Sequence, residues 1–116
     1  MKENIIKNKT FGFAIRIINL SKFLQDKKEF ILSKQILRSG TSIGAMIRES
    51  EHAESKTDFI HKFSIAQKEA NETQYWLELL HKTDFIDQKM FKSLNDDIIE
   101  IQKIITSIII SSKKKN

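Results

Sequence analysis

The stretch Lys56–Lys82, KTDFIHKFSIAQKEANETQYWLELLHK, carries the clearest periodic signal in the chain. Its apolar and small residues recur at alternating intervals of four and three: Phe59, Phe63, Ala66, Ala70, Thr73, Leu77 and Leu80. This spacing puts them on one face of a helix and is typical of the seam between helices in a bundle or coiled coil. Ser55 or Thr57 can cap the first turn. We therefore expect a helix over residues 56–82 that packs against other helices.

Three more helices are expected around this stretch. The chain has no proline to interrupt a helix, and an aromatic content of 9% disfavours an all-β fold. Capping residues and apolar spacing predict helices from Asn8 or Thr10 to Asp26, from Phe30 to Ala53 and from Asp87 to Ser112. The inward faces of the last two carry Leu32, Ile36, Gly40, Ile43 and Ile47, and Leu94, Ile98, Ile101, Ile105 and Ile108.

The connections between these helices are short, which favours antiparallel neighbours. Residues 1–116, with 40% hydrophobic and 30% charged residues, fit a single globular domain. The predicted fold is therefore all-α: an antiparallel up-down-up-down four-helix bundle. The basic tail at residues 113–116 is expected to be flexible.

The helices carry more apolar surface than one bundle needs. On the first helix, Phe13, Ile17, Leu20 and Leu24 form one stripe, while Phe11, Ile15 and Ile18 lie nearly opposite. A second stripe on residues 56–82 includes Ile65, Trp76 and Leu79. Exposed apolar stripes on a monomer promote aggregation, so these six residues predict a homo-oligomer interface. The alternative is that the crossing angles bury them all inside the bundle.

Two glycines, Gly40 and Gly44, stand in the middle of the helix predicted from Phe30 to Ala53. Each costs about 1 kcal/mol relative to alanine in a helix. A phosphate-binding loop would need a preceding strand and a P-loop lysine, which this segment lacks. We expect instead that the small residues let a neighbouring helix approach closely.

Composition also bears on location. The chain has no cysteine, its N-terminus MKENIIKNKT lacks the apolar core of a signal peptide, and no segment reaches the roughly 18 apolar residues of a membrane span. We expect a cytoplasmic protein that does not enter a membrane.

Positive charge is concentrated in the first half. Residues 1–48 hold ten Lys or Arg and three acids, a net charge of +7, whereas residues 49–112 have a net charge of −5. Within residues 30–53, the face opposite the apolar stripe carries Lys34, Arg38, Thr41, Ala45, Arg48 and His52, with no acid among them. This pattern predicts contacts with RNA or DNA phosphates. The expected contact residues are Lys34, Arg38 and Arg48, with Lys27, Lys28, Lys113, Lys114 and Lys115 contributing.

Base recognition is not expected on this surface, because most aromatic residues fall in the helical seams and leave no exposed stacking platform. Binding should therefore be weakly sequence-specific. The alternative is that the basic stripe is only a solvated helix face.

The strongest signal for catalysis is a pair of Glu-x-x-His matches, Glu49 with His52 and Glu78 with His81. Di-iron bundles use this motif on two of their helices. With a turn near residue 54, however, Glu49 and Glu78 are expected to lie roughly 35 Å apart, at about 1.5 Å rise per residue. One metal pair cannot span that distance. We expect no metal site, no cofactor and no enzymatic activity; a di-metal oxidase is a distant alternative.

The segments FGFAIRIINLSKFL (11–24) and LSKQILRSGTSIGAMIRESEHAESKTDFIHKFSIAQKEANETQYWLELL (32–80), with the Ile-rich last helix, resemble a known family. It comprises small bacterial four-helix-bundle proteins encoded within 23S rRNA intervening sequences. That group is similar to the accessory variability proteins of diversity-generating retroelements. Met46 is a departure, because the family's usual Gly-Ala-Asn reads Gly44, Ala45, Met46 here.

The resemblance implies a homopentameric barrel of four-helix bundles with a basic surface that binds nucleic acid. In the retroelement branch it also implies binding to a reverse transcriptase. An accessory scaffold that binds a reverse transcriptase or another protein is therefore the alternative to a nucleic-acid-binding protein.

Overall fold

The computed structural model describes residues 2–115, with the side chains of residues 4–115. It contains four helices in this range: α1 (Lys2–Asp26), α2 (Ile31–Ser50), α3 (Lys56–Lys82) and α4 (Gln88–Lys114). No strand occurs within the described residues. The prediction of an all-α protein with four helices is confirmed.

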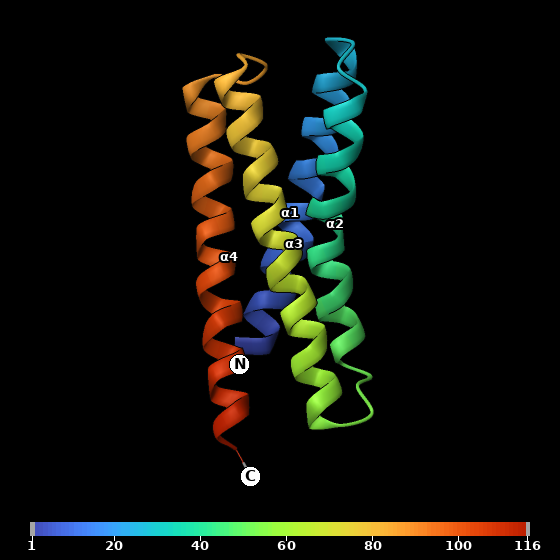
Figure 1. Cartoon of the computed structure of the whole chain (residues 1–116), viewed down its shortest axis with the longest axis vertical. Coiled ribbons are helices and arrows are strands. Elements are labelled where there is room, and N and C mark those ends of the chain that lie inside the picture. Colours follow the sequence, from blue (N-terminus) through green and yellow to red (C-terminus); the bar gives the residue numbers. More distant parts are fainter. Residues whose placement is uncertain (1, 116) are drawn as a thin grey trace.

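Successive helices run antiparallel and pack in chain order, and α4 returns to lie beside α1 (Figure 1). The bundle measures 50 × 21 × 19 Å. Its upper end in Figure 1 carries the α1–α2 and α3–α4 turns, and its lower end carries the α2–α3 turn and both chain ends. Because α1 and α3 lie diagonally across the bundle, their outer faces point in different directions.

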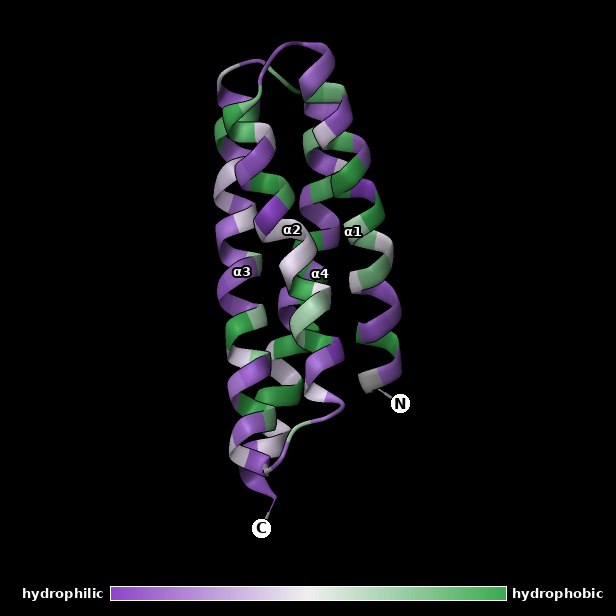
Figure 2. Cartoon of the chain, turned by 90° about the vertical axis from the view of Figure 1, so that its right-hand side faces the viewer, coloured by the Kyte–Doolittle hydropathy of each residue, from purple (hydrophilic) through white to green (hydrophobic). Residues whose placement is uncertain are grey.

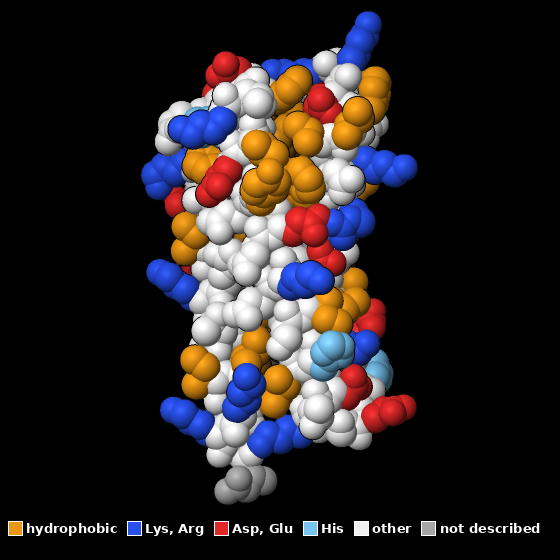
Figure 3. All heavy atoms as spheres, in the orientation of Figure 1, with side chains coloured by type: hydrophobic (Ala, Val, Ile, Leu, Met, Phe, Trp, Pro, Cys, Tyr) orange, Lys and Arg blue, Asp and Glu red, His pale blue; other side chains and the backbone are white. Residues whose placement is uncertain are grey.

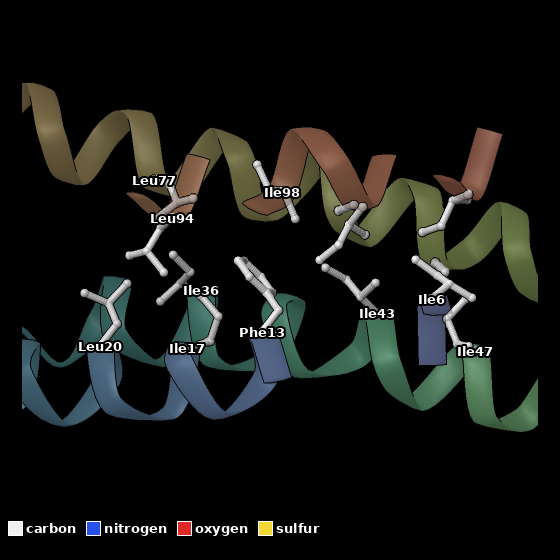
Figure 4. Close-up of a cluster of buried hydrophobic side chains, with 14 of the residues drawn as sticks. Ile6, Phe13, Ile17, Leu20, Ile36, Ile43, Ile47, Leu77, Leu94 and Ile98 are labelled. Carbon is white, nitrogen blue, oxygen red and sulfur yellow. The ribbon is translucent and has the colours of Figure 1, made fainter. Parts of the chain in front are cut away.

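The core runs along the whole bundle, and hydrophobic positions recur on every helix (Figure 2). In Figure 4, side chains from all four helices meet at its centre, including Phe13, Ile36, Leu77 and Ile98. Each of these is at most 2% exposed. Burying one such side chain contributes about 1.5–3 kcal/mol relative to leaving it in water. The 4-3 seam of α3 is buried from Phe63 to Leu80, and Phe59 is half-buried at its lower end.

The start of α1 differs from the prediction. The helix begins at Lys2, and Asn8 and Thr10 lie inside it instead of capping it. Thr10 is buried, and its Oγ1 donates to the carbonyl oxygen of Ile6 at 2.8 Å. Ile6 is fully buried, so an additional turn of helix adds a side chain to the core. This gain in apolar burial exceeds the local preference of Asn and Thr for capping positions.

Other helix ends differ by a few residues. α3 has the predicted bounds, whereas α2 ends at Ser50 instead of Ala53. α4 continues past Ser112 to Lys114, so the first two residues of the predicted flexible tail are helical and Lys115 is the C-cap. Asn116, the last residue of that tail, lies outside the described residues.

Glycines bring α1 and α2 into close contact. A Cβ atom added at Gly40 would lie 2.8 Å from the Ile17 side chain of α1, and one at Gly44 would lie 3.3 Å from the carbonyl oxygen of Thr10. Real Cβ atoms almost never approach another heavy atom as closely as 2.8 Å. Met46, at the family's usual Asn position, is half-buried against the core.

Candidate nucleic-acid interface

Three predicted contact residues lie at the upper end of the bundle. Lys27 and Lys28 form the α1–α2 turn, and Lys34 is in the first turn of α2. The Lys27 ammonium donates to the carbonyl oxygen of Phe85 at 3.3 Å, which joins this turn to the α3–α4 turn. Lys28 and Lys34 are exposed and form no ion pair with any described residue. Both ammonium groups are therefore available to a ligand.

Arg38 is not available in the same way, which corrects the interpretation of the α2 face as free of acids. Its guanidinium pairs with Glu69 at 3.3 Å and with Glu72, both on α3. Glu72 also accepts a hydrogen bond from Nε1 of Trp76 at 3.0 Å. The two carboxylates offset the charge of Arg38. The α2 sequence alone contains no sign of them, because they reach Arg38 from another helix.

Arg48 lies over the ring of Phe11, with its guanidinium carbon 5.0 Å from the ring centroid. Both residues line a groove of about 280 Å³ between α1 and α2, whose other lining residues include Thr41, Gly44 and Ala45. Arg48, a predicted nucleic-acid contact, therefore lies against Phe11, a predicted oligomer contact. A partner that covers Phe11 would also cover Arg48.

Lys113, Lys114 and Lys115 are exposed at the lower end of the bundle. This end lies opposite Lys28 and Lys34 in a molecule 50 Å long. The predicted contact residues therefore form two separate groups and not one continuous surface.

The predicted oligomer contacts also fall on two separate faces. Phe11, Ile15 and Ile18 lie on the outer face of α1 and are 53%, 48% and 40% exposed. Ile65, Trp76 and Leu79 are half-buried on α3. In Figure 3, hydrophobic side chains gather over the upper parts of α2 and α3. We call the two sets of predicted oligomer contacts the α1 face (Phe11, Ile15, Ile18) and the α3 face (Ile65, Trp76, Leu79).

Other exposed hydrophobic residues were not among the predicted interface residues. They are Ile5, Phe30, Ile31, Tyr75 and Ile110. The aromatic residues Tyr75 and Phe30 are 54% and 60% exposed, so the expectation of no exposed stacking platform is wrong. For Tyr75, the sequence signal of this exposure is its position outside the 4-3 seam of α3.

The two Glu-x-x-His matches lie far apart, and Glu49 and His81 each have another contact. Glu49 accepts a hydrogen bond from Lys62 at 3.1 Å, which raises the pKa of Lys62 above its ordinary value. His81 stacks on Phe91, with ring centroids 4.5 Å apart. Glu78 lies on α3 beyond Lys62 by 16 residues, or about 24 Å of helix. Among the described residues, no group of three or more His, Asp or Glu side chains could hold a metal ion.

The described helices include none that is long and apolar enough to span a membrane.

Comparison with known proteins identifies the family. Residues 2–107 match the family model of the 23S rRNA-intervening sequence protein. The chain belongs to this family. A crystal structure of a protein of unknown function from the S23 ribosomal protein family of Bacteroides thetaiotaomicron VPI-5482 is 59% identical, with a TM-score of 0.92. The alignment covers 94% of this chain and 98% of that one.

The curated proteins contain no match to this chain. The predicted membership of the intervening-sequence family is confirmed. The resemblance to retroelement accessory proteins stays a prediction.

Proposed function

We propose that this 23S rRNA-intervening sequence protein is a non-enzymatic helical module that assembles with copies of itself and binds RNA or DNA through its phosphates. The observation that carries nucleic-acid binding is a pair of exposed lysines at the upper end, Lys28 and Lys34, which form no ion pair with any described residue. Lysine ammonium groups bind phosphates as point charges without reading sequence. The family name of the similar crystal structure, S23 ribosomal protein, also suggests an RNA context.

The proposed assembly is a ring, a pentamer by the family resemblance. It is supported by the position of the two apolar faces, because α1 and α3 lie diagonally across the bundle. A head-to-tail contact uses two different surfaces of one protomer and closes into a ring when the rotation allows. In a ring of several copies, the lysines of each protomer add to one electrostatic field, and multivalent contact strengthens weak binding.

The predicted basic residues do not support the proposal equally. Lys27, Lys28 and Lys34 act together at the upper end, and Lys113, Lys114 and Lys115 form a second contact at the lower end. Arg38 contributes little to binding, because Glu69 and Glu72 already neutralise it. Arg48 contributes only where the α1 face is left open.

Charge reversal tests the proposal. We expect Lys28→Glu with Lys34→Glu to weaken binding of labelled RNA at least tenfold in low salt, measured by fluorescence anisotropy. The slope of log K against log salt should become shallower by about 0.7 to 0.9 for each phosphate that the variant no longer neutralises. The matched control is Lys68→Glu with Lys103→Glu, which makes the same change in net charge at exposed lysines of α3 and α4.

If both double variants weaken binding equally, the upper lysines are not a site and only net charge matters. If the wild type binds no nucleic acid even at low salt, the proposal is wrong. The scaffold that binds a reverse transcriptase or another protein would then be the better function. Stoichiometric iron or manganese in untagged protein would instead favour the di-metal oxidase.

A further inference from the structure

A cavity of about 380 Å³ opens on the surface of α3 and α4 near the upper end of the bundle. It is lined by Tyr75, Glu78, Leu79, His81, Lys82 and Phe91. Three of these side chains carry aromatic rings, one is a carboxylate and one is an ammonium. None of the six is fully buried in the core, and only Leu79 belongs to one of the two apolar faces. The volume falls within the usual range for small-molecule sites.

The rings of this cavity are held by other rings. His81 and Phe91 stack at 4.5 Å with an interplanar angle of 11°, which joins α3 to α4. The rings of Tyr75 and Trp76 form a T-shaped pair, with centroids 5.1 Å apart and an interplanar angle of 64°, yet Tyr75 is still 54% exposed. A large ring that is fixed on one side and open on the other is suited to stacking with a flat ligand.

The charged groups of the cavity are available to a ligand. Glu78 and Lys82 stand one helical turn apart on α3, but no ion pair joins them, and neither has another partner in the described part of the chain. A carboxylate accepts hydrogen bonds from the exocyclic amino group of cytosine, and a lysine pairs with phosphate. A nucleotide carries a flat ring, an amino edge and a phosphate together.

We propose that this cavity binds one unpaired base of a single-stranded RNA or DNA. The base stacks on Tyr75, its amino group donates to Glu78, and the adjoining phosphate contacts Lys82. The inference rests on the proposed nucleic-acid function and specifies its substrate: single strands, with a preference for bases that present an amino group. Bases in a duplex are stacked and paired, and they cannot enter the cavity.

Trp76 provides a direct readout, because it is the single tryptophan of the chain and its ring contacts Tyr75. The probes are an oligocytidine and an oligouridine of about twelve nucleotides, within the site sizes of single-strand binding folds, and an RNA duplex. Cytosine presents an amino donor where uracil presents a carbonyl acceptor, so the two strands differ at the position that Glu78 reads. We expect the oligocytidine to bind most tightly and to change Trp76 emission.

Three variants test the residues of the cavity. Tyr75→Ala should weaken single-strand binding at least about fivefold and leave duplex binding unchanged, whereas Tyr75→Phe keeps the ring and should bind like the wild type. Glu78→Gln should abolish the preference for cytidine, since an amide can pair with either pyrimidine. The matched control is Ile5→Ala, which removes an exposed apolar side chain of α1 outside the cavity and should change neither strand preference nor emission.

The outcomes separate this inference from the proposed function. If the wild type binds both strands and the duplex equally, with Tyr75→Ala unchanged and Trp76 emission unaffected, the cavity is not a base site and the lysine contacts stand alone. If no probe binds at low salt, both proposals are wrong. Circular dichroism of each variant establishes that the helices are intact.

Discussion

At the scale of single residues, the glycines of α1 and α2 differ in a way that a mutation can measure. Gly40 faces the fully buried Ile17, which cannot move aside for an added methyl group. At Gly12, apart from its chain neighbours and the nearby backbone of its own helix, no described heavy atom lies within 4 Å of the ideal Cβ position. We expect Gly40→Ala to lower the free energy of unfolding by about 1 kcal/mol, because overpacking outweighs the gain in helix propensity. Gly12→Ala should raise it by up to about 1 kcal/mol. Urea unfolding at one protein concentration measures both, and a Gly40→Ala protein as stable as Gly12→Ala would contradict this explanation.

At the scale of helices, side chains cap the starts of α3 and α4. Oδ1 of Asp87 accepts from the amide of Met90 at 2.8 Å, and Ser55 serves the same role for α3. We expect Asp87→Ala to cost about 1 kcal/mol of unfolding free energy. The matched control, Asp96→Ala, removes an exposed pair with Lys92 and should cost less than about 0.5 kcal/mol. Equal losses from the two variants would mean that the cap does not stabilise α4.

Some features of the helices could be predicted from the sequence and others could not. The bounds of α3 follow from its own 4-3 spacing, since a seam within one helix needs no knowledge of the partner. The predicted start of α1 was wrong, because the burial of Ile6 depends on the rest of the core. The pairing of Arg38 with Glu69 and Glu72 was missed for a similar reason: the register between α2 and α3 decides which side chains meet. The cavity beside Tyr75 likewise exists only when α3 and α4 pack together.

At the scale of the whole molecule, the proposed assembly would link the apolar faces to the basic ends. An isolated protomer would leave the α1 face exposed to water. Exposed apolar surface of this kind promotes association. In the proposed ring, the α1 face would pack against the α3 face of the next copy, and the upper lysines would repeat around the ring. The proposed nucleic-acid binding would then depend on assembly, because one protomer offers few cations at either end that form no ion pair with a described residue.

The mass of the protein in solution tests this account most directly. Size-exclusion chromatography with light scattering at micromolar concentration should give about 68 kDa, five copies of the 13.6 kDa chain. Ile15→Glu, in the α1 face, should give a helical protein of 13.6 kDa, whereas Ile110→Glu replaces an equally exposed residue of α4 and should remain assembled. A wild-type protein of 13.6 kDa under these conditions would contradict the account.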